Sequence, residues 1–222
     1  MTDFRPKYIT FDCYGTLTRF RMSDMTDQVF GDRVKPDDMP TFKRDFQYYR
    51  LDEVLGAWKP YSEVLSNAVE RTCRRWGIQF RPEDGKVYYN AVPTWGPWPD
   101  VTEGLVKIAD KIPLVILSNA SNDQIHANVE KLGAPFHKVF TAQDAQAYKP
   151  RLRAFEYMLD QLGADPSEIL HVSSSNRYDI MSVHDLRFGG RCFVARGHEP
   201  FNSYYATVQI KDISELPGVV GL

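Results

Sequence analysis

The sequence has few cysteines, no long apolar run and no strong imbalance of charge. Its three cysteines, Cys13, Cys73 and Cys192, are too few for a disulfide framework, and no CxxC pair indicates a zinc site. No apolar stretch approaches the roughly 18 residues needed to span a bilayer. The first residues, MTDFRPKYITF, also lack the apolar centre of a signal peptide. These absences predict a cytoplasmic protein with no membrane partner.

The formal net charge is only −2, and the basic residues are scattered along the chain. A chain without a concentrated basic region does not favour a nucleic-acid partner. Hydrophobic residues make up 43% of the 222 residues, which suits a globular protein with a sizeable core. This length fits one medium domain, or a core domain with a smaller inserted unit.

Short apolar segments rich in β-forming residues occur once near the start of the chain and repeatedly in its second half. We predict strands at residues 8–11, 114–117, 138–141, 169–172, 191–194 and 207–210. Apolar residues at helical spacing predict helices at 101–109, 125–132 and 154–162. This alternation predicts parallel βαβ units, and therefore an α/β fold with a Rossmann-like, three-layer core.

Residues 20–95 break this alternation, because they contain no convincing strand. Segments 40–55, 62–76 and 82–92 are instead of helical character. The stretch PTWGPWP follows at residues 93–99, where three prolines and a glycine disfavour regular structure and suit a return connection. We therefore predict a core domain of residues 1–19 and 96–222, with an inserted helical domain of residues 20–95.

Polar side chains follow several predicted strands directly. In an open α/β sheet, ligands bind outside the carboxyl ends of the strands, so these side chains are expected to meet at one edge. The candidates are Asp12, Tyr14, Thr16, Ser118, Asn119, Ser174, Asn176 and Asp179, together with Lys149 before the helix at 154–162.

Each candidate also has an ordinary structural explanation. Asp12 could cap a turn or a helix, and Ser118 and Asn119 could cap the helix that follows them. The SSSN segment could be only a loop, and Lys149 could be a surface lysine. Their joint occurrence at strand ends favours a functional site instead.

A carboxylate in such a site can act as a nucleophile and form an ester or acyl phosphate that water later opens. A nearby ammonium such as Lys149 is expected to keep the pKa of Asp12 low by charge pairing. Hydroxyls and backbone N–H groups of the 14–16 turn and of residues 118–119 would bind an anionic part of the substrate. Asp179 could hold Lys149, activate water or bind a metal.

The segments FDCYGTL, LSNAS, AYKP and SSSNRYD, in this order, resemble the haloacid dehalogenase superfamily. Tyr14 and the SSSN form of the last motif resemble its type II 2-haloacid dehalogenase branch. The resemblance covers most of the chain and implies that the helical insert is the cap domain of that family. It also implies a reaction without cofactor or metal, a small carboxylic acid as substrate, and a homodimer formed through the cap.

The position two residues after Asp12 separates the branches of this superfamily. The phosphatases of this superfamily carry a D-x-D motif, in which the second aspartate is a general acid and its backbone carbonyl binds Mg²⁺. In this chain the residue at that position is Tyr14. A departing halide needs no proton, so the resemblance implies an (S)-2-haloacid dehalogenase. Asp12 would displace halide from an L-2-haloalkanoate, and water would hydrolyse the resulting ester to the D-2-hydroxy acid.

The resemblance also implies roles for the other motif residues. Those expected to position Asp12, Lys149 and the attacking water are Thr16, Ser174, Asn176 and Asp179. Those expected to contact the substrate are Ser118 and the turn amide near Tyr14 for the carboxylate, Asn119 for the halide, and Tyr178 as an apolar wall.

The chain departs from the branch at two places. The cap arginine of the branch has no counterpart in register within TFKRDFQYYR, which offers Lys43, Arg44 and Arg50; we assign the role to Arg44. A tyrosine expected six residues after the motif lysine is replaced by Phe155, so one hydroxyl is missing. These departures leave three alternatives open: cleavage of another carbon–heteroatom bond, such as opening a small cyclic amino acid; a Mg²⁺-dependent phosphohydrolase; and a non-catalytic binding protein.

Overall fold

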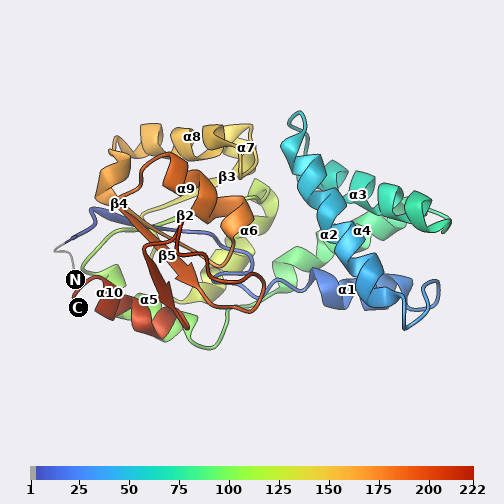
Figure 1. Cartoon of the computed structure of the whole chain (residues 1–222), viewed down its shortest axis with the longest axis horizontal. Coiled ribbons are helices and arrows are strands. Elements are labelled where there is room, and N and C mark those ends of the chain that lie inside the picture. The colour runs from blue at the N-terminus through green and yellow to red at the C-terminus, as the bar shows by residue number, and fades with distance from the viewer. Residues whose placement is uncertain (1–3) are drawn as a thin grey trace. The chain divides into compact units, whose positions relative to one another are not determined.

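Six parallel strands form one sheet, in the order β3-β2-β1-β4-β5-β6, in the computed structural model, which describes residues 4–222 (Figure 1). All six predicted strands are present, and β2 and β4 each extend into the serine that follows the apolar run. Their bounds are β1 Tyr8–Phe11, β2 Leu114–Ser118, β3 Lys138–Thr141, β4 Ile169–Ser173, β5 Gly190–Val194 and β6 Val208–Ile210.

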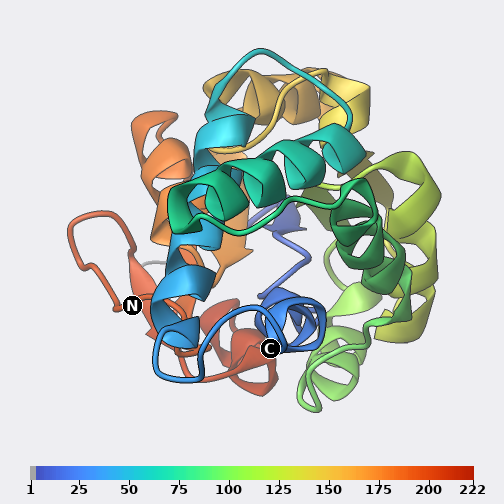
Figure 2. The same cartoon turned by 90° about the vertical axis from the view of Figure 1, so that its right-hand side faces the viewer.

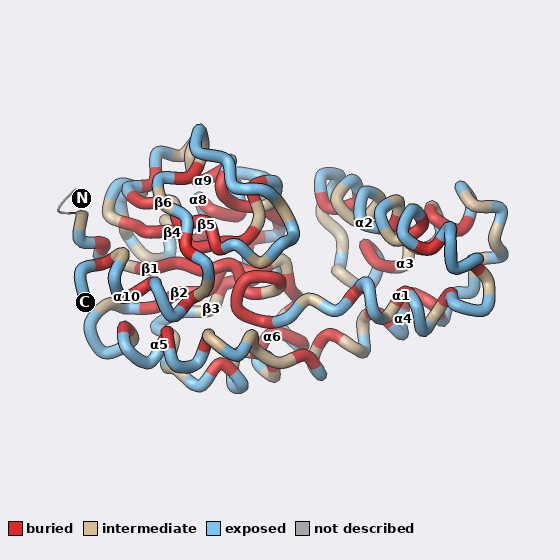
Figure 3. The backbone as a smooth tube through the Cα atoms, turned by 60° about the horizontal axis from the view of Figure 1, so that its bottom comes forward, coloured by how far each residue is buried: buried red, intermediate tan, exposed pale blue. Residues whose placement is uncertain are grey.

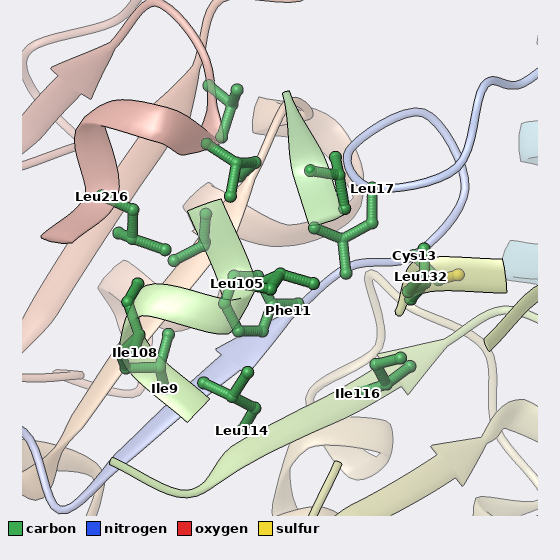
Figure 4. Packing of buried hydrophobic residues seen from close by; sticks show 14 of the residues in the cluster. Ile9, Phe11, Cys13, Leu17, Leu105, Ile108, Leu114, Ile116, Leu132 and Leu216 are labelled. Atoms are coloured by element: carbon green, nitrogen blue, oxygen red, sulfur yellow. The ribbon is translucent and has the colours of Figure 1, made fainter. Parts of the chain in front are cut away.

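Alternating side chains of the strands form two apolar clusters, one on each face of the sheet. On one face, Ile9 and Phe11 pack with residues of α5 (Val101–Ala109), α6 (Asn122–Val129) and α10 (Leu216–Val219), as Figure 4 shows in part. On the other face, Val115 and Leu117 pack with α8 (Leu152–Leu162) and α9 (Met181–Asp185). Helices therefore cover both faces of a parallel sheet, which confirms the predicted α/β fold class.

The helix after β2 does not begin where we predicted. It starts at Asn122 rather than Ile125, because Ser121 is the last residue with extended backbone, and it ends at Val129 before the 3₁₀ turn η2 (Glu130–Leu132). We had predicted the helix from the spacing of apolar residues, and the first turn of α6 is polar, so the predicted start was three residues late. The remaining short elements of the core are α7 (Ala142–Ala145), η3 (Pro166–Glu168), η4 (Asn176–Ile180) and η5 (Ile213–Glu215).

Contacts divide the chain into two compact units, one of residues up to Arg19 together with Gly96–Leu222, and one of Phe20–Trp95. The second unit contains α1 (Met22–Phe30), α2 (Met39–Leu55), α3 (Tyr61–Trp76), α4 (Pro82–Ala91) and η1 (Val92–Thr94), coloured blue to green in Figure 2. Helix α1 was not predicted, and η1 shows that regular structure continues into the proline-rich stretch. Buried and exposed residues alternate along these helices (Figure 3).

The two connections to the helical unit lie beside each other in the core unit. Thr18 forms an isolated antiparallel β-bridge with Pro97, and the backbone N–H of Arg19 donates to the Gly96 carbonyl at 2.9 Å. The chain therefore leaves and re-enters the core at adjacent points. Among the helices of residues 4–222, none is both long enough and apolar enough to cross a membrane.

Candidate active site

Asp12, Lys149 and Asp179 form a buried cluster at the carboxyl ends of β1 and β4. Lys149 Nζ lies 2.9 Å from Asp12 Oδ1 and 2.7 Å from Asp179 Oδ1. The side chains of Lys149 and Asp179 are 1% and 0% exposed, whereas that of Asp12 keeps 11% of its surface exposed. One ammonium group therefore bridges two carboxylates, and Asp12 is the carboxylate that retains access to solvent.

The turn after β1 fixes the second oxygen of Asp12. Gly15 has a φ of 100°, a backbone conformation that favours glycine, and the following Thr16 donates its hydroxyl hydrogen to Asp12 Oδ2 at 2.7 Å. Thr16 Oγ1 also accepts from the backbone N–H of Ser174 at 2.9 Å and lies 3.2 Å from Ser174 Oγ. Thr16 thus joins the β1 turn to the loop after β4.

Two influences shift the pKa values of Asp12, Asp179 and Lys149: all three groups are buried, and the two carboxylates share the one ammonium. Burial raises the pKa of Asp12, and the charge of Lys149 offsets this only partly because Asp179 adds to the rise. The expectation that Lys149 keeps the pKa of Asp12 low was therefore wrong. Burial also acts on Asp179, but Lys149 and the hydrogen bond from His171 lower the pKa of Asp179. Despite burial, the two carboxylates raise the pKa of Lys149, so it stays charged.

Two polar residues of β4 complete the surroundings of Asp179: His171, which we did not predict, and Ser173, the first residue of the SSSN motif, for which we predicted no role. His171 Nε2 lies 3.1 Å from Asp179 Oδ1, and Ser173 Oγ donates to Asp179 Oδ2 at 3.0 Å. His171 Nδ1 lies 2.8 Å from Thr10 Oγ1 on the neighbouring strand. A histidine inside a strand that reads as fully buried requires polar partners, and this was the signal in the sequence.

The end of β2 brings Ser118 and Asn119 to the same edge. The Asn119 amide donates to the Lys149 carbonyl at 2.8 Å and accepts from the Lys149 N–H at 2.7 Å, so it fixes the lysine loop. Ser118 Oγ is buried and has no hydrogen-bond partner among the described residues. Helix α6 follows Ser121, so the alternative that Ser118 and Asn119 cap this helix was wrong.

The segment after β4 forms the π-helical turn η4. Glu199, which we did not predict, holds the start of this turn. Its Oε2 accepts from the Asn176 N–H at 2.8 Å and from the Arg177 N–H at 3.3 Å, and its Oε1 accepts from the hydroxyl of the preceding Ser175 at 2.7 Å. The Asn176 side chain donates to the Pro200 carbonyl at 2.8 Å, while its Oδ1 is buried without a partner in the described chain. Tyr178 is half-buried on the same turn.

Two other residues predicted to contact the substrate, Tyr14 and Arg44, lie in different units of the chain. The Tyr14 hydroxyl donates to Asn128 Oδ1 of α6 at 2.8 Å, which fixes the ring after β1. Arg44 belongs to the helical unit, where it is exposed and donates to Thr41 Oγ1 at 3.3 Å.

The other two basic candidates of α2 differ from Arg44. Lys43 forms an ion pair with Asp27, with Nζ 2.6 Å from Oδ2. Arg50 is half-buried, and its Nε is buried with no hydrogen-bond partner within residues 4–222. Its guanidinium lies 5.0 Å from the ring centres of two phenylalanines, Phe20 and Phe46.

Asp12 is a candidate nucleophile, and its carboxylate is paired with Lys149. Between residues 4 and 222, no group of three or more His, Cys, Asp or Glu side chains is arranged to hold a metal ion. The two site carboxylates instead share the ammonium of Lys149. A carboxylate that is oriented at both oxygens and partly accessible, as Asp12 is, can attack an electrophilic carbon.

Known proteins resemble this chain over most of its length. The sequence profile of the haloacid dehalogenase-like hydrolases matches residues 6–185. An (S)-2-haloacid dehalogenase of Pseudomonas sp. (strain YL) is 27% identical over 220 residues, which cover 97% of this chain and 94% of the relative.

Solved structures share the fold. A dehalogenase crystallised with an intermediate complex has a TM-score of 0.82 at 21% identity and covers 100% of both chains. The L-2-haloacid dehalogenase of Xanthobacter autotrophicus with covalently bound chloropropionic acid has a TM-score of 0.78 at 21% identity, covering 97% of this chain and 98% of that one.

Proposed function

The chain belongs to the haloacid dehalogenase-like hydrolases, and we propose that it is an (S)-2-haloacid dehalogenase. The observation that carries this proposal is the pairing of Asp12 with Lys149 in a site where Tyr14 replaces a second aspartate. Such a site provides a nucleophile without a general acid, which suits a leaving group that departs unprotonated. Relatives named (S)-2-haloacid dehalogenase at 24–27% identity support the same assignment.

In the proposed first step, a carboxylate oxygen of Asp12 attacks the α-carbon of an L-2-haloalkanoate. The new C–O bond forms as the C–X bond breaks, the halide leaves with the electron pair, and the α-carbon is inverted. Burial favours this step, because a poorly solvated carboxylate gains by sharing its charge with the departing halide. Lys149 then remains paired with Asp179.

In the proposed second step, water attacks the carbonyl carbon of the Asp12 ester. This breaks the bond between that carbon and the ester oxygen, releases the D-2-hydroxy acid and restores Asp12. The unpartnered Oδ1 of Asn176 is an available acceptor for the water, and Ser174 lies beside Thr16 at the same edge. Asp179 would hold Lys149 in place and receive one proton from the water, which then passes to the departing oxygen of the 2-hydroxy acid, while the second proton of the water leaves to solvent.

The substrate-binding roles are also proposals. The buried hydroxyl of Ser118 and the amides of the turn near Tyr14 would bind the substrate carboxylate, because an unpartnered buried hydroxyl gains most from a ligand. The Asn119 amide has a second N–H to offer the halide, and the ring of Tyr178 would form an apolar wall. A homodimer and a cytoplasmic location stay predictions.

We propose Arg50 in place of Arg44 as the cap cation, because Arg50 forms no ion pair with a carboxylate among the described residues and its Nε has no hydrogen bond; elsewhere its guanidinium hydrogen-bonds the Tyr61 hydroxyl. We expect Arg50→Gln to raise KM for L-2-chloropropionate about 10- to 100-fold, the loss typical of a charge-assisted hydrogen bond. The matched control, Arg44→Gln, should change KM less than about twofold. Steady-state kinetics with a melting curve for each variant tests this. A large KM effect only in Arg44→Gln would restore the original assignment.

The proposed reaction has a direct test. The protein is incubated with L-2-chloropropionate in EDTA, chloride is measured, and a single turnover is run in ¹⁸O water with the enzyme in excess. We expect chloride release that EDTA does not reduce, and ¹⁸O in the peptide that contains Asp12, because water attacks the Asp12 carbonyl carbon. Phosphate-ester hydrolysis only with added Mg²⁺ would indicate the phosphohydrolase. Ring opening of a four-membered cyclic amino acid without chloride release would indicate the other alternative.

A further inference from the structure

A buried histidine on β4 links the reaction cluster to the centre of the sheet. His171 is 0% exposed and lies directly across from Thr10 in the register of β1 and β4. Its Nδ1 is 2.8 Å from Thr10 Oγ1 and its Nε2 is 3.1 Å from Asp179 Oδ1. The His171 ring therefore connects the Thr10 hydroxyl on β1 with Asp179 Oδ1, the oxygen that Lys149 also contacts.

The partners of His171 determine where its proton lies. The ionised carboxylate of Asp179 only accepts hydrogen bonds, so Nε2 carries the hydrogen and donates it. In a neutral imidazole Nδ1 is then an acceptor, and the Thr10 hydroxyl donates to it. The result is a directed chain of hydrogen bonds from Thr10 through His171 to Asp179.

Aromatic side chains hold this ring in place. The rings of Phe155 and Phe188 meet the His171 ring edge-on, at centroid distances of 5.8 and 6.2 Å. Phe155 occupies the position where the type II branch is expected to carry a tyrosine, and it has no hydroxyl to donate. Both phenylalanine rings are apolar, so they fix the His171 ring without offering it a hydrogen bond.

We propose that His171 is a positioning residue of the reaction: its Nε2–H holds Asp179 beside Lys149. This inference rests on the proposed function. Asp179 Oδ1 is shared between Lys149 and His171, while Oδ2 accepts from Ser173, so both oxygens are fixed. A fixed Asp179 in turn holds Lys149 within reach of Asp12.

The groups that face Asp179 decide the effect of losing this donor. Lys149 and His171 contact it, and Asp12 lies on the far side of the ammonium. Without the His171 hydrogen bond, the ionised form of Asp179 is less stabilised, so the pKa of Asp179 rises. Asp179 would then be protonated, and release Lys149, at a higher pH than in the wild type. Once Lys149 is released, its charge no longer lowers the pKa of Asp12, so the acid limb of kcat that Asp12 sets moves to higher pH.

The test compares His171→Phe, which fills the space without a donor, with His171→Gln, which can keep an N–H near the position of Nε2. We expect His171→Phe to lower kcat about 10- to 100-fold with little change in KM, and to move the acid limb of kcat to higher pH. His171→Gln should retain most of kcat, and the acid limb of its pH profile should stay at the wild-type pH. Phe188→Leu is the control, because it disturbs the same aromatic cluster without changing a hydrogen bond to Asp179.

A measurement that does not depend on turnover separates this inference from the proposed function. Long-range ¹H–¹⁵N NMR of the imidazole rings, assigned by the signal missing in His171→Phe, should show His171 protonated at Nε2 and bare at Nδ1. An Nδ1–H ring, or wild-type kcat and acid limb in His171→Phe, would overturn the inference. A wild type that releases no halide, with the Nε2–H ring present, would instead count against the proposed reaction alone.

Discussion

Asp12→Asn is expected to abolish halide release, with kcat lowered by at least about 10⁴-fold, because the neutral amide is a poor nucleophile and cannot form the ester. The loss should come from chemistry and not from unfolding. Removing one of two carboxylates leaves Lys149 paired with Asp179, so no charge in the cluster loses its counter-ion. Chloride release and the melting temperature of the variant test both parts of this expectation.

A matched control is Asp160→Asn on the exposed side of α8, which makes the same chemical change away from the site. It should leave turnover unchanged. Mass spectrometry of acid-quenched protein should detect the substrate-derived adduct in the wild type and in this control, but not in Asp12→Asn. If Asp12→Asn kept its function, the protein would be a binding protein and not a hydrolase that uses this carboxylate.

Lys149→Met is expected to lower kcat by at least about 10³-fold and to destabilise the fold by about 3–5 kcal/mol, the cost of leaving buried carboxylates without their cation. Burial already raises the pKa of Asp12 above its ordinary value of 3.8. Activity of the wild type should therefore fall as the pH drops through a value above 3.8, because only ionised Asp12 attacks. Without Lys149 the pKa of Asp12 rises further, so residual activity should increase with pH.

The double variant Lys149→Met/Asp179→Asn separates stability from chemistry. It removes one charge of each sign, so stability measured by urea unfolding should recover relative to Lys149→Met, whereas turnover should not. The control Lys107→Met, on an exposed i,i+4 pair of α5, should leave both quantities nearly unchanged. Wild-type turnover in Lys149→Met would exclude Lys149 from the reaction.

The fold class followed from patterns that act over a few residues. The inner strands β1 and β2 were visible as short, mainly apolar runs, because a parallel sheet covered on both faces needs apolar side chains in all directions. The edge strands β3 (KVFT) and β6 (VQI) mix polar and apolar residues. The helices were less accurate at their ends. The start of α6 lies in a polar first turn. Helix α1 is only nine residues long and buries Met22, Thr26 and Phe30, so its apolar face consists of two side chains and was not recognised in the sequence.

The site could be predicted in part, because its motif residues follow strands whose ends meet at one edge. The structure brings Asp12, Thr16, Lys149, Ser174 and Asp179 into contact through side chains or backbone. What the sequence did not reveal depends on distant partners. Glu199 reaches η4 from the loop after β5, and the raised pKa of Asp12 depends on how deeply one ammonium and two carboxylates are buried together.

The chain leaves the core unit at Thr18–Arg19 and returns at the adjacent Gly96–Pro97, so the helical unit is an insertion at one point of the core. The inserted unit contributes no strand to the sheet, so a change in its length or sequence does not shift the register of β1 against β4. Changes confined to residues 20–95 can therefore leave the contacts of Lys149 with Asp12 and Asp179 in place.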